Sequence, residues 1–250
     1  MLLLADIGNT NISFAVVKAK KITKKFLVRT PTGCDPDELK KLSREIYRYS
    51  GMIEKIVVVS VVPRALTELL RIFRRTFRGV PVAVVGKGIK VPIKNCYKKR
   101  SEVGQDRLLT SFAALCRVKP PIVVIDFGTA VTMDYVNEKK EYHGGFIFPG
   151  LRLSLNSLVR NTALLPMIDL RLTKGFLGKS TAESINNGII YGYAAFCDGL
   201  IAMFREKYGR SLNIVATGGD AAIIAKYSKY VQKVYPDLIF DGLINILEKV

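Results

Sequence analysis

Two aliphatic segments of this chain each run directly into an aspartate, and this repeat is the feature that most constrains the fold. Residues 2–6 read LLLAD and residues 122–126 read IVVID. A short, continuous aliphatic run is typical of a strand that is buried on both faces. A carboxylate at the end of such a run is costly to bury without a partner, so each strand is expected to deliver its aspartate to a polar site.

Each aspartate is followed by a glycine two positions later and then by short polar side chains. Glycine lets the backbone approach a ligand closely, and turn amides with small hydroxyls can surround an anion. A carboxylate beside phosphates requires a cation between them, and Mg²⁺ is commonly held by one or two carboxylates plus phosphate oxygens. The repeat therefore predicts a metal–nucleotide site at Asp6 and Asp126, with Asp6 reaching Mg²⁺ through water.

The order of strand and helix signals indicates an α/β chain whose second half restarts the architecture of the first. Pro120 and Pro121 separate the halves, and we expect lobes at 1–119 and 120–250 with a ligand cleft between them. The expected strands are 2–8, 12–17, 24–30, 55–62, 80–86, 121–128, 130–136, 140–150 and 212–217. The expected helices are 35–50, 63–77, 104–118, 151–165, 181–209 and 219–228.

The composition argues against a membrane-spanning protein, a secreted protein and a His-rich metal site. No apolar run approaches the roughly 20 residues of a membrane span, and the first residues lack the basic lead region of a signal peptide, so a cytoplasmic protein is expected. The single histidine, His143, excludes a His-rich metal site and is expected on the surface or in a turn. The cysteines lie far apart without a C-x-x-C motif and are expected to be reduced structural thiols. They are Cys34, Cys96, Cys116 and Cys197.

The formal net charge is +18, and residues 1–125 hold 25 Lys and Arg against 9 Asp and Glu. A basic half of this kind could attract nucleic acid or another polyanion. The alternative is a solvated surface, and residues 64–77 favour it. Their leucines and phenylalanines share one face of a predicted helix, while most of the arginines lie elsewhere.

A third glycine turn, at Thr217 to Ala221, follows a strand and could close over a nucleotide base and ribose. In this order the three glycine turns resemble those of the acetate and sugar kinase, heat-shock 70 and actin superfamily. The segments DIGNTN, SVVP, VGQDR, IDFGTAVTMD, GGFIFPGLRLSLNSL, NTALLP and TGGDA further resemble the type III pantothenate kinase family. The resemblance runs from residue 2 to about residue 221. It implies two ribonuclease-H-like lobes, an actin-like fold and phosphorylation of pantothenate by ATP, the first step of coenzyme A biosynthesis.

The resemblance also implies roles for individual residues. Asp126 is expected to bind a monovalent cation, K⁺ or NH₄⁺, and Asp106 to act as the base that accepts the proton of the pantothenate hydroxyl. The implied ATP contacts are Asp6, Ile7, Gly8, Asn9, Thr10, Asn11, Ile12, Ser13 and Thr129. The implied pantothenate contacts are Tyr97, Gly104, Gln105, Asp106, Arg107 and Thr181.

Structural alternatives stay open at three of these positions, and for Tyr97 the alternative is ordinary packing of a loop tyrosine. Asp106 could instead pair with Arg107 at a helix start, and Thr181 could cap a helix. Arg100 and Gln105 depart from the family pattern, in which proline and a small residue are usual. Gly144, Gly145 and Pro149 are expected to shape a rigid turn.

The family resemblance implies a homodimer, with residues 189–204 as an interface or, more simply, as core. Two other functions stay open. One is another kinase or phosphatase of the superfamily. The other is a nucleotide-dependent regulator that binds nucleic acid through the basic half.

Overall fold

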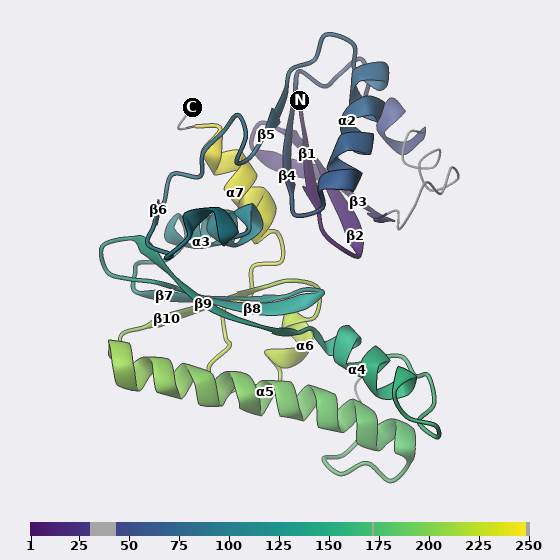
Figure 1. Cartoon of the computed structure of the whole chain (residues 1–250), viewed down its shortest axis with the longest axis vertical. Coiled ribbons are helices and arrows are strands. Elements are labelled where there is room, and N and C mark those ends of the chain that lie inside the picture. The colour runs from purple at the N-terminus through teal and green to yellow at the C-terminus, as the bar shows by residue number, and fades with distance from the viewer. Residues whose placement is uncertain (31–43, 172, 249–250) are drawn as a thin grey trace. The chain divides into compact units, whose positions relative to one another are not determined.

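The computed structural model describes residues 1–30, 44–171 and 173–248 (Figure 1). Most of the helix expected at 35–50, and Cys34, lie outside the described residues. Internal contacts divide the chain into two compact units. The first comprises Met1–Pro92, Ser101–Ala113 and Ile239–Val250, and the second comprises Ile93–Arg100 and Ala114–Leu238. The units are interleaved along the chain, and the lobe boundary between residues 119 and 120 remains a prediction.

The first unit is built on a five-stranded sheet in the order β3-β2-β1-β4-β5. β1 pairs antiparallel with β2 and parallel with β4, so the carboxyl ends of β1 and β4 lie at the same edge. The strands span Leu2–Ile7 (β1), Asn11–Lys18 (β2), Lys21–Arg29 (β3), Lys55–Ser60 (β4) and Val82–Val84 (β5). The aliphatic runs of β1 and β4 are buried on both faces, as their composition predicts.

Helix α2, Pro63–Thr76, covers one face of this sheet (Figure 1). It begins with proline at its first turn, where the missing N–H has no intrahelical partner to lose. Leu66, Leu69 and Phe73 are buried against the sheet core, whereas the arginines of the helix are exposed. The solvated-surface interpretation of the basic helix fits this arrangement.

The second unit repeats the core of the first. Its sheet has the order β10-β7-β8-β9-β6, with β7, β8 and β9 as an antiparallel meander and β10 parallel to β7. β7, β8, β9 and β10 thus correspond to β1, β2, β3 and β4, and the predicted fold class is confirmed. The strands span Lys94–Asn95 (β6), Ile122–Phe127 (β7), Ala130–Val136 (β8), Glu141–Pro149 (β9) and Asn213–Thr217 (β10).

Helix α5, Thr181–Tyr208, lies along one face of the second sheet, with α4, Leu151–Arg160, beside it (Figure 1). Ile189, Ile190 and Cys197 of α5 are buried in the same core as Val123 and Ile125 of β7. The simpler prediction for residues 189–204, core packing, is therefore correct for this face of the helix. Among the described residues, α5 is also the one helix long and apolar enough to cross a membrane by length and composition, a test that a soluble core helix also passes.

Several expected elements differ from those observed. The strand expected at 140–150 is confirmed as β9, so Gly144, Gly145 and Pro149 lie within a strand and do not form the rigid turn also expected of them. A β-carbon on Gly145 would lie 1.8 Å from the carbonyl oxygen of Met133, so glycine is needed here for the close approach of β8. α4 ends at Arg160 rather than near 165, and α6 covers only Ala221–Ile224.

Further elements lie in the described residues before β7 and after α6. Residues 94–102 contain β6 and a 3₁₀ turn, Arg100–Glu102. Helix α3 spans Gln105–Leu115, as expected from its apolar pattern. Helix α7, Leu238–Ile246, had not been expected.

Candidate active site

The first predicted phosphate hairpin is the turn between β1 and β2 in the first unit. Asp6 pairs with Ser13 and Ile7 with Ile12, and the intervening turn closes through the Gly8 N–H, which donates to the Asn11 carbonyl at 3.0 Å. The Thr30 hydroxyl donates to the Gly8 carbonyl at 2.6 Å and ties the turn to the end of β3. Asn9 and Thr10 are exposed at the tip, while Asp6, Asn11 and Ser13 are half-buried. The hairpin therefore presents polar groups from a fixed backbone.

The segment Gly104–Arg107 lies near this edge of the same unit. The Val61 N–H donates to the Ile7 carbonyl at 3.1 Å, directly after β4. A β-carbon on Gly104 would lie 3.7 Å from Val61 Cγ1 and only 2.3 Å from Asp106 Oδ1. Glycine at 104 thus leaves room for the Asp106 carboxylate, close to where the β1 and β4 strands end.

Asp106 stands in the first turn of α3, where a negative charge is favoured by the helix dipole. Its Oδ1 accepts a hydrogen bond from the backbone N–H of Arg107 at 2.8 Å. Arg107 is itself buried, although an arginine is seldom buried without polar partners. This geometry is compatible with both interpretations of Asp106, catalytic base or helix-start contact, which differ in their kinetic consequences.

Gln105, one of the two departures from the family pattern, packs against a glycine. A β-carbon on Gly86 would lie 2.8 Å from Gln105 Cγ and Cδ, and Gly86 has a φ of +85°. The larger side chain at 105 is therefore accommodated by the absence of a side chain at 86.

The second aspartate, Asp126, stands near the end of β7 in the second unit. It pairs with Thr132 of β8 and with Thr217 of the parallel strand β10. A β-carbon on Gly218, which has a φ of +93°, would lie 2.5 Å from Asp126 Oδ1. The missing side chain at Gly218 leaves Asp126 Oδ1 uncovered on this side. A carboxylate oxygen is the kind of ligand that Mg²⁺ or another hard cation prefers.

Thr129 lies in the β7–β8 turn, and Gly150 packs closely on that turn. The Gly150 N–H donates to the Thr129 carbonyl at 3.0 Å, and a β-carbon on Gly150 would lie 2.3 Å from the Gly128 carbonyl oxygen. This contact positions the turn against the start of α4.

Asp220 and Arg152 are two charged residues of this region that sequence reasoning did not assign. Asp220 is buried, and Arg152 Nη2 lies 3.5 Å from its Oδ1. Burial raises the pKa of Asp220, and the Arg152 guanidinium acts in the opposite direction. The Asp220 N–H also reaches the Phe127 carbonyl at 3.3 Å, so the third glycine turn is joined to β7. The TGGDA segment contained the aspartate, but no local signal indicates its arginine partner.

Tyr97, a predicted pantothenate contact, is half-buried in the second unit. A β-carbon on Gly144 would lie 2.9 Å from Cδ2 and Cε2 of the Tyr97 ring, so the ring rests on the Gly144 backbone. The Tyr97 N–H donates to Asn95 Oδ1 at 2.9 Å, which fixes the backbone at this residue.

Thr181 is exposed at the first position of α5. The prediction that it might cap the helix is wrong, because the cap is Ser180, whose hydroxyl accepts from the Glu183 N–H at 3.3 Å. The Glu183 carboxylate in turn accepts from the N–H of Lys179, the residue before the cap, at 2.7 Å, so the pair resembles a capping box displaced by one residue. The structural alternative for Thr181 is thereby removed.

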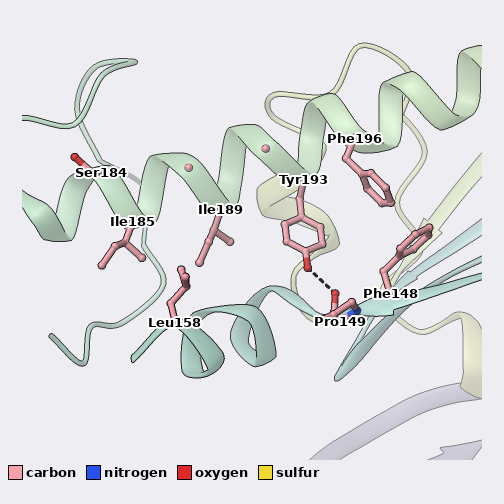
Figure 2. Close-up of a pocket in the computed structure, with 10 residues that line it drawn as sticks. Phe148, Pro149, Leu158, Ser184, Ile185, Ile189, Tyr193 and Phe196 are labelled. Carbon is pink, nitrogen blue, oxygen red and sulfur yellow. Dashed lines mark hydrogen bonds between the residues drawn. The ribbon is translucent and has the colours of Figure 1, made fainter. Parts of the chain in front are cut away.

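A groove of about 490 Å³ lies between the end of β9, α4 and α5 (Figure 2). Its walls are mainly apolar, with Leu158 from α4 facing Ile185 and Ile189 of α5. The Tyr193 hydroxyl donates to the Pro149 carbonyl at 2.6 Å and links α5 to the strand. The predicted catalytic and binding residues are not among its lining residues.

Comparison with solved structures supports the fold. The chain aligns with a conserved Baf family protein from Campylobacter jejuni with a TM-score of 0.61 and 19% identity, over 99% of this chain and 98% of that one. It also aligns with the ethanolamine utilization protein EutJ from Carboxydothermus hydrogenoformans, with a TM-score of 0.53 and 12% identity, over 98% and 88% of the two chains.

Comparison of sequences identifies the family. The model of the type III pantothenate kinase family matches residues 2–203. The type III pantothenate kinase of Syntrophotalea carbinolica is 36% identical over 247 residues, which is 97% of this chain and 96% of the relative. That of Bacillus cytotoxicus is 33% identical over 253 residues, covering 100% of this chain and 96% of the relative. Because its motifs and almost its whole length match this family, the chain belongs to the type III pantothenate kinase family.

Proposed function

We propose that this protein transfers the γ-phosphoryl group of ATP to the primary hydroxyl of pantothenate, producing 4'-phosphopantothenate and ADP for coenzyme A biosynthesis. The observation that carries this proposal is the similarity to type III pantothenate kinases over 97% of the chain. The placement of the matching aspartates and glycine turns at sheet edges supports it.

The ATP contacts proposed are Asp6–Ser13 and Thr129. The two turns offer backbone N–H groups and short polar side chains, which suit phosphate oxygens. Mg²⁺ with ATP and a monovalent cation, K⁺ or NH₄⁺, would neutralise charge on the phosphates when bound. Asp6 is proposed to approach Mg²⁺ through water, and Asp126 to hold the monovalent cation.

Asp106 is the proposed catalytic base. As the pantothenate hydroxyl oxygen bonds to the γ-phosphorus, its proton passes to an Asp106 oxygen and the bond to ADP breaks. Arg107 is a permanent cation that suits the pantothenate carboxylate. Gly104, Gln105, Tyr97 and Thr181 complete the proposed pantothenate contacts.

A homodimer and a cytoplasmic location are also part of the proposal. Apolar side chains that are exposed in the single chain support an interface on the second unit, in and beyond α4. Leu164 is 91% exposed and Leu177 is 75% exposed, values that are costly for large apolar groups in contact with water. Met203 on α5 is exposed as well.

The decisive experiment is a coupled assay of ADP release with purified protein, Mg²⁺, ATP and pantothenate, in the presence and absence of K⁺. Pantothenate-dependent ADP release that rises with K⁺ is expected. A panel of sugars and short acids tests other kinase activities, and ADP release without an acceptor tests simple hydrolysis. Absence of turnover with pantothenate, with turnover of another acceptor, would overturn the substrate assignment.

A further inference from the structure

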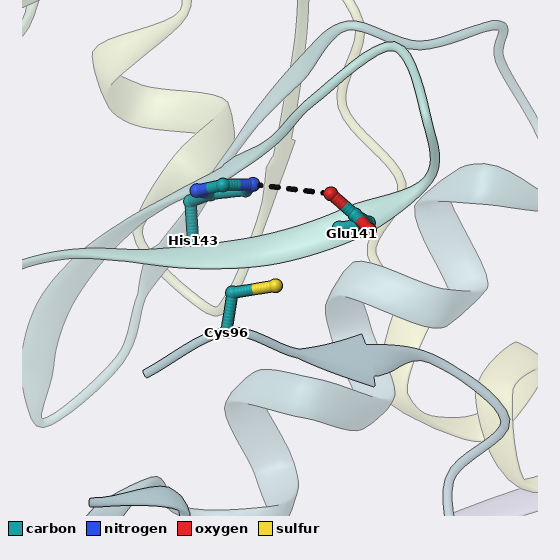
Figure 3. Close-up of side chains that lie close together, drawn as sticks. All are labelled: Cys96, Glu141 and His143. Atoms are coloured by element: carbon teal, nitrogen blue, oxygen red, sulfur yellow. Dashed lines mark ion pairs between the residues drawn. The ribbon is translucent and has the colours of Figure 1, made fainter. Parts of the chain in front are cut away.

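Three side chains of different chemistry converge beside β9: Cys96, Glu141 and His143 (Figure 3). Their ligand atoms, a thiol sulfur, a carboxylate oxygen and an imidazole nitrogen, all lie within 4.8 Å of one another. None of the three is among the proposed ATP or pantothenate contacts. The single histidine excludes a His-rich metal site, but it leaves a mixed site of this kind open.

The strand geometry explains why these residues meet. Lys94 of β6 pairs with Glu141 of the parallel strand β9, and the Cys96 N–H donates to the Tyr142 carbonyl at 2.8 Å. The Glu141 and His143 side chains project to the same side of β9, with the buried Tyr142 between them in sequence (Figure 3). Cys96, two residues after Lys94, faces them from the neighbouring strand (Figure 3).

A bulge in β9 also directs His143. Tyr135 of β8 pairs with Gly144, but the next residue of β8, Val136, pairs with Tyr142. His143 is therefore the extra residue of the bulge, an arrangement that re-aims a side chain relative to a regular strand. The imidazole is 42% exposed and accessible to solutes.

The separation between the imidazole and carboxylate ligand atoms matches that expected around a small tetrahedral cation. His143 Nε2 lies 3.5 Å from Glu141 Oε2. Zinc bonds of about 2.0–2.3 Å place neighbouring ligand atoms roughly 3.3–3.7 Å apart. Asn137 Nδ2 lies 2.9 Å from each of these two atoms, so both already direct a lone pair toward one electropositive group. A metal ion would take the place of that amide N–H.

The Glu141 carboxylate supplies a negative charge that favours a cation, and the neighbouring Lys94 ammonium group competes with that cation. The Glu141 carboxylate accepts hydrogen bonds from Lys94 Nζ at 2.5 Å and from Asn137 Nδ2 at 2.9 Å, so two donors hold it in place. Lys94 Nζ lies 2.5 Å from Oε1, which leaves the other oxygen, Oε2, facing His143. The ammonium group is expected to weaken metal binding by repulsion.

We propose that Cys96, Glu141 and His143 bind one divalent transition-metal ion of the Zn²⁺ class, with water as the fourth ligand. A thiolate, an imidazole and a carboxylate together suit Zn²⁺ or Co²⁺, whereas Mg²⁺ and Ca²⁺ prefer oxygen ligands alone. On binding, the Cys96 thiol loses its proton to solvent and its sulfur bonds to the metal. Three protein ligands with an open fourth position leave the ion able to exchange.

Cobalt provides the direct test, because a Co²⁺–thiolate bond gives a charge-transfer band in the near ultraviolet. Metal-free protein with Cys34→Ser as background is titrated with Co²⁺ without nucleotide, and Zn²⁺ then displaces the cobalt. One Co²⁺ per chain with this band is expected. Cys96→Ser should abolish the band, and His143→Ala should weaken binding at least about 10-fold, since loss of even an outer partner costs 10–100-fold. Cys116→Ser, which removes another exposed thiol, is the matched control and should bind as the parent does.

Lys94→Met is expected to change the Co²⁺ affinity in the opposite direction, toward tighter binding. Removal of the ammonium group beside Glu141 should tighten Co²⁺ binding several-fold, and circular dichroism checks that each variant is folded. The proposal is overturned by a missing thiolate band in the parent, by a band that survives Cys96→Ser, or by equal or weaker binding in Lys94→Met. Because metal binding is read directly, these outcomes are independent of kinase activity.

Discussion

Gly218 lies directly against Asp126: a β-carbon at position 218 would stand 2.5 Å from Asp126 Oδ1 and 2.6 Å from the backbone nitrogen of Phe127. The φ of Gly218 is +93°, a conformation that other residues adopt only with strain. The Asp126 carboxylate therefore fits because residue 218 has no side chain, although the two residues are far apart in sequence.

Gly218→Ala is therefore expected to lower the free energy of unfolding by about 1–3 kcal/mol, because the methyl group adds both backbone strain and a collision. Urea denaturation measures the change. Gly219→Ala is the matched control, since a β-carbon there meets no atom within 4 Å. Equal stability of the two variants would contradict the close packing on Asp126.

Asp106→Asn tests the proposed base while retaining the size of the side chain. If Asp106 accepts the hydroxyl proton, kcat should fall on the order of 10²–10⁴-fold, which is roughly 3–5 kcal/mol of transition-state stabilisation. ATP affinity should change little. Glu102→Gln, which removes a carboxylate from the preceding 3₁₀ turn, is the control and should retain kcat.

The helix-start interpretation of Asp106 makes the opposite prediction. The variant would then lose thermal stability and raise KM for pantothenate, with kcat close to that of the parent. Measurement of kcat, KM and melting temperature on Asp106→Asn distinguishes the two roles. A near-normal kcat would rule out the catalytic one.

Asp126→Ala is expected to weaken activation by K⁺, because the variant loses the carboxylate proposed to hold the cation. The K⁺ concentration for half-activation should rise at least about 10-fold, equivalent to about 1.4 kcal/mol of binding free energy. Assays across a K⁺ series at constant ionic strength measure the change, and circular dichroism verifies folding. An unchanged K⁺ dependence in a folded variant would remove this role from Asp126.

Gly144→Ala should raise KM for pantothenate more than it lowers kcat. The new methyl group would lie 2.9 Å from two atoms of the Tyr97 ring and displace a side chain proposed to contact the substrate. Steady-state kinetics with varied pantothenate provide the readout. Gly199→Ala in α5, where no atom lies within 4 Å of the added carbon, should leave both constants unchanged.

Cys197 is expected to resist alkylation in the native protein. Burial raises the pKa of its thiol to about 12, and the thiolate is the reactive form. In a Cys34→Ser background, iodoacetamide should modify the exposed Cys96 and Cys116 first, and Cys197 only after addition of denaturant. Peptide mass spectrometry over a time course tests this order, and native modification of Cys197 at the rate of Cys116 would contradict it.

Much of the fold could be predicted from residues that are close together in sequence. The aliphatic runs before Asp6 and Asp126 predicted two buried strands, and Pro63 with its periodic leucines predicted α2. These signals are local because the apolar residues that bury both faces of a strand, or one face of a helix, are close together in sequence. The glycine turns and the family resemblance likewise indicate the candidate site from the sequence.

The elements that were missed or misplaced depend on contacts between distant residues. β6 is only two residues long and exists because Lys94 and Asn95 pair with β9. Gly144 and Gly145 suggest a turn by composition, but the close approach of β8 and the Tyr97 ring explain them as strand residues. Propensity is a weak guide where tertiary packing decides.

The sequence alone determined the residue types available for chemistry: two strand-end aspartates, three glycine turns and the Gly104–Arg107 segment. Tertiary structure decided which of them touch within each unit, as in the Gly218–Asp126 contact and the Arg152–Asp220 pair. It also brought together Cys96, Glu141 and His143. The physical reason is that strand register and side-chain packing join residues far apart along the chain, and neighbouring residues do not encode such pairings.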